Sequence, residues 1–398
     1  MRHTRTTARE RGMLDKARFL ERITADAESH IELLQRFIQA RSPNPPGNTA
    51  AAAQVLREYL SARGVATEII APDGLEKPNF VAERGGVDMK AGTAASVIAF
   101  AYLHQHRQHL RRKHSSVALT VVSDEETGGK FGSRYPLERD PAREAWKGTV
   151  MINAEPGGLQ SIRFGEKGTL RMTFRVVTLG VHGAYTHLSE GANRIAARLI
   201  GRLVDVVEAI QPEWDDEVHK QLKREEVTKV IDEIMGEGAH TSVLRPTVNI
   251  GTIHGGIKVN MIPDRCVFEA DIRLPIGLLK NAVLARIDEL LRDEFPTTAA
   301  YEVQEAASNP PSHCSPSHEM VGALANAAET VTGRRPLAIP SLGATDAKFW
   351  RYHQVPAYVY GVGPETMAAA VDERVSVKEF LSVVRTHALA VWSFLDGE

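Results

Sequence analysis

Cysteine is nearly absent from this sequence of 398 residues, which contains only Cys266 and Cys314. Two cysteines do not make a disulfide framework, and they do not supply the ligands of a cysteine metal site. A fold that depends on disulfides is therefore excluded, and an intracellular, cytoplasmic protein is expected.

Long apolar runs are also missing, although 43% of the residues are hydrophobic. No run reaches the roughly 20 residues that a membrane-spanning helix needs. The basic stretch 1–11 is not followed by the apolar region of a secretory signal, so we interpret it as a frayed tail. The net charge of −2 favours neither nucleic acid nor an anionic membrane as a partner. The length predicts two domains, or one large domain with an insertion.

The main functional signal is the acidic segment Ser123–Gly129 (SDEETGG), which contains the adjacent acids Glu125 and Glu126. The β-branched run Val117–Val122 precedes it and is predicted to be a buried strand. Ligands and catalytic groups of open α/β sheets lie at the carboxyl ends of strands. One carboxylate would then bind a metal while the other moves a proton. The alternative is a group of solvated acids in a loop.

The remaining pattern predicts an α/β protein with an inserted domain. Before the insertion we expect helices at 14–40, 50–63 and 92–106 and strands at 65–70, 79–83 and 149–153. The insertion has strands at 169–178, 247–253, 265–274 and 300–306 and helices at 193–210 and 278–295. This β-α-β-β-α-β order is the ferredoxin-like arrangement. The tail returns to α/β, with helices at 317–332 and 377–395 and a strand at 357–360. We therefore predict a discontinuous catalytic domain, residues 1–166 and 308–398, and an inserted domain, residues 167–307.

Seven short motifs, in this order, make nearly the whole chain from about Ile31 resemble one family. It is the di-zinc metallopeptidase and deacylase family of acetylornithine deacetylase, succinyl-diaminopimelate desuccinylase, carboxypeptidase G and aminoacylase. The motifs are Val87–Gly92 (VDMKAG), Asp124–Gly128 (DEETG), Asn153–Pro156 (NAEP), Asn249–Gly251 (NIG) with Gly255–Gly256, Asn260–Asp264 (NMIPD), Asp271–Arg273 (DIR) and Gly343–Ala347 (GATDA).

The resemblance implies a metal-dependent amide hydrolase acting on N-acyl amino acids or small peptides, with two zinc ions per subunit. Asp88 resembles the carboxylate that bridges the two metals, and Glu126 and Glu155 resemble their terminal ligands. Glu125 resembles the general base that takes a proton from the metal-bridging water. This assignment is chemically coherent, because two cations lower the pKa of the water and a nearby carboxylate takes and returns the proton.

The resemblance also implies that the inserted domain forms a homodimer and closes over the substrate. His182 or His187 resembles the family histidine that stabilises the developing oxyanion, often across the dimer. We favour His182, because a small insertion then restores the family's distance to Asn193; for either residue, an ordinary surface histidine is the alternative. Substrate binding is expected from Asn260, Arg273 and Gly343. The fork of the arginine suits a substrate carboxylate, and the alternative for Asn260 and Arg273 is a polar pair at a strand edge.

Two histidines of the family pattern are missing. Family members have a strand ending in Gly-His-x-Asp before the Asp-Met-Lys motif, whereas here Glu83–Gly86 (ERGG) runs directly into Val87, and the chain contains no His-x-Asp. The stretch Gly363–Glu373 also lacks its histidine, and Glu365 is expected as a substitute ligand. The join suggests a lost exon or an internal deletion. A transcript running continuously across 84–88, with no longer form, would contradict that hypothesis.

The expected ligand set is therefore made of oxygen atoms alone. Imidazole favours zinc, whereas carboxylates suit magnesium, manganese or calcium; cobalt is a further candidate. Converging acids without their cations repel one another, so one of them should hold a proton at neutral pH. We expect weak zinc binding and low activity. The alternative function is a non-catalytic homologue that dimerises and binds a ligand or partner without turnover.

Overall fold

The computed structural model describes residues 15–42, 48–76, 86–110, 116–123, 125, 128–139, 146–363 and 373–397, and of residues 86–88 only the backbone. The chain divides into two compact units. Unit 1 comprises Met1–Phe164, Ser315–Ile339 and Thr345–Glu398, and unit 2 comprises Gly165–Cys314 and Pro340–Ala344. Within these described ranges, no helix is both long and apolar enough to cross a bilayer.

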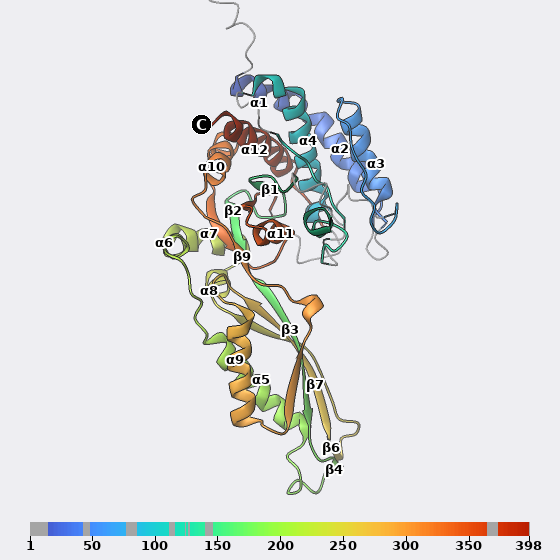
Figure 1. Cartoon of the computed structure of the whole chain (residues 1–398), viewed down its shortest axis with the longest axis vertical. Helices are drawn as coiled ribbons and strands as arrows, with labels where there is room; N and C mark the ends of the chain where they lie inside the picture. The colour runs from blue at the N-terminus through green and yellow to red at the C-terminus, as the bar shows by residue number, and fades with distance from the viewer. Residues whose placement is uncertain are drawn as a thin grey trace, which may run out of the picture. The chain divides into compact units, whose positions relative to one another are not determined.

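Helices make up most of unit 1 (Figure 1). The sequence predicted a single helix over 14–40, but the structure divides it at Asp26, whose φ of −92° and ψ of 17° leave helical geometry. The buried helix α4 is apolar on all sides, as expected for a helix enclosed by other elements. It packs against α12, which in turn packs against α10. The helices are α1 (Lys16–Ala25), α2 (Ala27–Gln39), α3 (Ala50–Ser61), α4 (Gly92–Gln105), α10 (Glu319–Thr332), α11 (Ala347–Tyr352) and α12 (Val377–Asp396).

A mixed sheet has the strand order β1-β11-β2-β10, with β9 also paired to β2. β1 runs parallel to β11, and β11 runs antiparallel to β2. The predicted strands near 149–153 and 357–360 are confirmed as β1 and β11, whereas β2, β9 and β10 were not expected. The strands are β1 (Met151–Asn153), β2 (Ser161–Glu166), β9 (Ser312–His313), β10 (Leu337–Ser341) and β11 (Ala357–Val359).

Two of the predicted strands of unit 1 were wrong. The segment 65–70 contains only a single bridging residue, Ile70, and Val117–Val122 pairs with no described strand. Val117 is 37% exposed, so the run is not the fully buried strand that its composition predicted. β-Branched composition makes a strand only where a neighbouring strand accepts its backbone groups. The predicted strand at 79–83 lies outside the described residues.

Unit 2 contains a four-stranded antiparallel sheet in the order β5-β7-β3-β8. The helices α5 and α9 contact each other, and α5 packs on β3, β5 and β7 (Figure 1). This confirms the predicted β-α-β-β-α-β order. The sheet strands are β3 (Gly168–Val177), β5 (Thr247–Gly255), β7 (Arg265–Leu274) and β8 (Ala299–Val303); the short pair is β4 (Val181–His182) with β6 (Met261–Ile262); the helices are α5 (Ala192–Glu208), α6 (Asp216–Leu222), α7 (Glu225–Met235), α8 (Ala239–Leu244) and α9 (Lys280–Glu294).

Strict alternation along the strands builds the core of unit 2. On β3 every second residue from Leu170 to Val176 is buried, and on β7 the same holds from Cys266 to Leu274. Successive side chains of a strand point to opposite faces, so this pattern puts one face against α5 and α9. Phe174 and Phe268 stack there with ring centroids 4.8 Å apart. The role expected for this unit, dimerisation and closure over the substrate, stays a prediction.

Candidate active site

A cavity of about 720 Å³ in unit 1 brings together described acids from three motifs. Glu125, Glu155 and Asp346 all line it, together with the buried serines Ser123 and Ser133. Glu155 follows the end of β1 by two residues and is 6% exposed, so a candidate acid does stand at the carboxyl end of a strand. Acids from three motifs therefore line one cavity.

Two glycines let other segments of the chain approach the backbone of Ala154 and Glu155 closely. A Cβ atom at Gly92, the first residue of α4, would lie 2.1 Å from the carbonyl oxygen of Ala154. A Cβ atom at Gly361, just after β11, would lie 2.2 Å from the carbonyl oxygen of Glu155. The Glu155 N–H donates to the Asn153 side chain over 2.6 Å, which fixes the turn. The motifs Val87–Gly92 and Asn153–Pro156 are thus in contact, as a shared site requires.

Lys90 shows that not every polar residue of these motifs is available for chemistry. Its buried ammonium donates to the carbonyl oxygens of Phe37 and Ala40 over 3.1 and 2.7 Å. These carbonyls belong to the C-terminal end of α2, where a cation compensates the unpaired acceptors of the helix. Burial lowers the pKa of Lys90. Lys90 therefore joins α2 to the start of α4.

Asp346 is a site residue to which the sequence gave no role. The Ser133 hydroxyl donates to Asp346 Oδ2 over 2.6 Å, and both residues are buried. Gly129 has a φ of +66°, and a Cβ atom there would lie 3.2 Å from Asp346 Oδ1. Asp346 thus supports the turn that follows the acidic segment. Its signal in the sequence was an acid inside a quoted motif, but nothing there pointed to its partner, 213 residues away along the chain.

The described donors of the cavity do not fit zinc. Among the residues described, no three His, Cys, Asp or Glu side chains are close enough to hold one metal ion. The backbone of Asp88 lies in the π-helical turn Gly86–Ala91, and Glu126 and Glu365 lie outside the described residues. Glu125 and Glu155 supply only carboxylate oxygens, which suit magnesium or manganese better than zinc.

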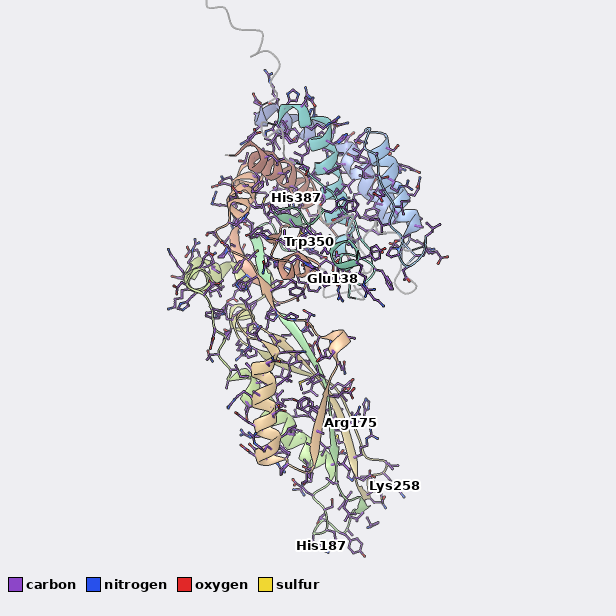
Figure 2. All side chains as sticks on the ribbon, in the orientation of Figure 1. Glu138, Arg175, His187, Lys258, Trp350 and His387 are labelled. Atoms are coloured by element: carbon purple, nitrogen blue, oxygen red, sulfur yellow. The ribbon has the colours of Figure 1, made fainter. Side chains whose placement is uncertain are left out.

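His387 supplies the one imidazole in the described lining of this cavity (Figure 2). Its Nε2 lies 2.7 Å from the carbonyl oxygen of Tyr360, an acceptor, so Nε2 carries the proton. Burial lowers the pKa of His387 to about 4, so the ring is neutral at pH 7. This histidine joins α12 to the end of β11 and is engaged in that contact.

The candidate lid histidine lies in unit 2, beside another candidate residue. His182 belongs to β4, is exposed, and pairs with Met261 of β6. The Gly183 N–H donates to the Asn260 carbonyl oxygen over 2.7 Å, so His182 and Asn260 share one tip of unit 2. His187 is exposed in the loop that follows β4, and Figure 2 labels it. The structure does not choose between the two histidines.

Arg273 pairs with Thr169 near the start of β3, at the opposite end of the unit 2 sheet from that tip. It is eight residues along β7 from Arg265, which corresponds to about 26 Å at the usual strand rise. Its guanidinium donates to Asp271 over 3.0 Å and to Thr169 over 3.1 Å. Arg273 and Asn260 of one protomer therefore do not meet. Gly343 is exposed, in a loop of unit 2 with open space around it.

Comparison with known proteins gives a family and a fold. The family described as Peptidase family M20/M25/M40 matches residues 42–393. An M20 family metallo-carboxypeptidase from Sulfolobus solfataricus has a TM-score of 0.67 at 16% identity, covering 93% of this chain and 99% of that one. Human carnosine dipeptidase 1 has a TM-score of 0.59 at 13% identity, covering 96% and 100%. A hydantoinase/carbamoylase family amidase from Burkholderia phymatum has a TM-score of 0.63 at 14% identity, covering 94% and 98%.

Proposed function

Because the chain belongs to peptidase family M20/M25/M40, we propose that it is a metal-dependent amide hydrolase acting on N-acyl amino acids or small peptides. Membership of this family makes it a hydrolase, and the family implies a divalent metal. The observation that supports the finer proposal is that Glu125 and Glu155 line the same cavity. They come from separate motifs, and a base and a metal ligand have to stand together for this chemistry.

In this proposal Glu125 moves the proton. It takes a proton from the attacking water and returns it to the leaving nitrogen. A divalent cation, when bound, polarises the amide carbonyl and lowers the pKa of water. Glu155 would hold it, with Asp88, Glu126 and Glu365 as the further ligands inferred from sequence. Because these donors are all carboxylates, manganese or magnesium should bind in preference to zinc, and cobalt should be included in any trial.

The arrangement of unit 2 supports a homodimeric site. His182 and Asn260 share one tip, whereas Arg273 lies at the far end of β7. If all three contact one substrate, they have to come from two subunits. The Arg273 guanidinium is paired with Asp271, so a substrate carboxylate would have to share or displace that pairing.

A non-catalytic homologue is the second candidate, and one observation favours it. Val117–Val122 leads into the acidic segment without a strand partner among the residues described. A catalytic carboxylate has to be held within about 0.5 Å of its productive position by rigid neighbours. A segment that lacks ladder partners among the described residues is poor support for the Glu125 that follows it. Such a protein would dimerise and bind a ligand without turnover.

The direct test is hydrolysis of N-acetyl and N-succinyl amino acids with added zinc, cobalt, manganese or magnesium. We expect Glu125→Gln to lower kcat at least about 100-fold, because the glutamine side chain, unlike the carboxylate that it replaces, cannot accept a proton from water. Glu329→Gln is the matched control, since Glu329 pairs with Arg335 on the exposed side of α10. Equal turnover of Glu125→Gln and the unsubstituted chain would overturn the assignment of the base. A folded dimer without turnover under any metal would favour the non-catalytic candidate.

Mixed dimers test the lid histidine. We expect His182→Ala to lower kcat about 100- to 1000-fold, as for loss of an oxyanion donor, and His187→Ala to change it little. If His182 acts across the dimer, mixing His182→Ala with Glu125→Gln restores up to about a quarter of the unsubstituted activity. No recovery after verified subunit exchange would place His182 in its own subunit's site or outside catalysis. The reverse ranking of the two alanine variants would assign the role to His187.

A further inference from the structure

Two separate stretches of unit 1 line the 720 Å³ cavity without interruption. One is Ser116–Ser123 and the other is Trp146–Glu155, which contains β1. If the cavity lay over one face of these stretches, only every second side chain would reach it, since neighbouring residues of a strand point to opposite faces. Because consecutive residues line it, the cavity lies beside both stretches, at the level of their backbones.

Along this cavity, Val117–Val122 and Ile152 have backbone groups for which the described residues offer no partner. No backbone hydrogen bond joins Val117–Val122 to any residue in the described part of the chain. Among the described strands, β1 lies at the edge of its sheet and is paired on one side with β11. Met151 and Asn153 direct their backbone groups to β11, with the Met151 N–H donating to Pro356 and the Asn153 carbonyl accepting from Tyr360. In a parallel ladder the intervening residue, Ile152, then directs its N–H and C=O to the opposite side.

The volume of the cavity is of the same order as that of one strand. Strands in a sheet lie about 4.8 Å apart and covering layers about 10 Å apart, so a five-residue strand takes up about 800 Å³. Buried backbone N–H and C=O groups are almost always paired in native proteins. A space of this size beside these backbone groups can therefore accept one added strand, paired through its main chain.

We infer that this cavity is a binding site for an extended apolar peptide, which adds a strand between β1 and Val117–Val122. The residues that line the cavity indicate which peptide side chains the site accepts. Phe100 and Leu103 of α4, and Val391 and Phe394 of α12, present apolar surface to the space. Strands covered by helices are rich in Val, Ile and Leu. The ligand is thus about five residues of β-branched or apolar type, held by main-chain hydrogen bonds as in other strand-addition complexes.

The test uses a labelled peptide, acetyl-Lys-Val-Ile-Val-Ile-Val-Lys-amide, and the full chain. Binding is followed by fluorescence anisotropy and by the emission of Trp146 and Trp350, two of the four tryptophans, both of which line the cavity. The control peptide has the same side chains with alternate backbone nitrogens methylated, which removes ladder donors. We expect the control to bind at least tenfold more weakly. Equal binding of the two peptides, or no binding of either, would overturn the inference.

Two protein variants locate the bound peptide. Ile152→Pro removes the N–H that points into the cavity and keeps the Met151 and Asn153 bonds to β11, so peptide affinity should fall at least tenfold. Circular dichroism and Tm establish that this variant is folded; if it is not, the methylated peptide still decides. Val259→Ser alters the exposed apolar tip of unit 2 and should leave binding unchanged. Loss of binding in Val259→Ser would show that the peptide sits on that tip and would overturn the inference. No readout depends on hydrolysis.

Discussion

The sheets of the two units differ in how completely their strands are paired. In unit 2, β3 and β7 pair over ten residues each, and β3 is also paired with β8 on its other side. In unit 1, β1 has three residues, and the nearby run Val117–Val122 is not part of the sheet. Both regions are rich in β-branched residues. The comparison teaches that β-branched composition alone does not predict a strand. A strand forms only where a neighbouring strand pairs with its backbone N–H and C=O groups.

The largest effects are expected from core substitutions in unit 2. Phe268→Ala removes a fully buried ring stacked on Phe174 and should lower the free energy of unfolding by about 3–5 kcal/mol. A matched valine pair then sharpens the comparison. Val176→Ala in β3 should cost about 2 kcal/mol, and Val121→Ala beside the cavity under about 1 kcal/mol, because fewer contacts are lost there.

Urea denaturation, followed by far-UV circular dichroism, measures these losses. The two units should each be tracked, since separate transitions would have to be analysed separately. Equal losses for Val176→Ala and Val121→Ala would contradict the comparison, because they would mean that Val121 is as closely packed as the core of unit 2.

A smaller loss of stability is expected at low pH, and it should occur in unit 1. Burial lowers the pKa values of both His30 and His387 to about 4. The unfolded chain, with an ordinary pKa near 6.5, binds these protons more readily, so stability falls as the pH decreases from about 6.5 to 4. At pH 5 the His387 contribution is a loss of about 2 kcal/mol.

His387→Gln tests this, because glutamine keeps a donor for the Tyr360 carbonyl but does not titrate. The difference in unfolding free energy between pH 7 and pH 5 should shrink by about 2 kcal/mol in this variant. His30 stays in place and accounts for the remaining slope. An unchanged difference in unfolding free energy between pH 7 and pH 5 would show that His387 does not contribute to the acid sensitivity.

The pattern in the sequence was sufficient for most of unit 2. Alternation over ten residues in β3 and β7 and amphipathic helices at α5 and α9 reflect burial on one face, which a single sequence reports directly. The bounds of α9 differed by two residues at its start and one at its end from the expected 278–295. The short strands β4, β6 and β9 were missed, because two residues show no period.

The candidate site was less predictable from sequence. The motifs correctly implied that segments distant along the chain meet, and Gly92 and Gly361 show the contacts that require glycine there. They did not reveal that the Lys90 ammonium donates to the Ala40 carbonyl oxygen at the C-terminal end of α2. Nor did they reveal that the Ser133 hydroxyl donates to Asp346. Such roles depend on partners far away along the chain, which local patterns do not report. The division of α1 from α2 at Asp26 was missed for a simpler reason, since both helices are amphipathic and follow one another without a break in pattern.

The most direct test of the central claim, a hydrolase fold with a ligand set poor in imidazole, is isothermal titration of the purified, metal-free chain with zinc. We expect a dissociation constant weaker than about 1 μM, or fewer than two zinc ions per subunit, because Glu125 and Glu155 offer only oxygen. A parallel titration with manganese gives the comparison for a metal that carboxylates suit. Two tightly bound zinc ions per subunit would contradict the account and would mean that other residues replace the missing histidines.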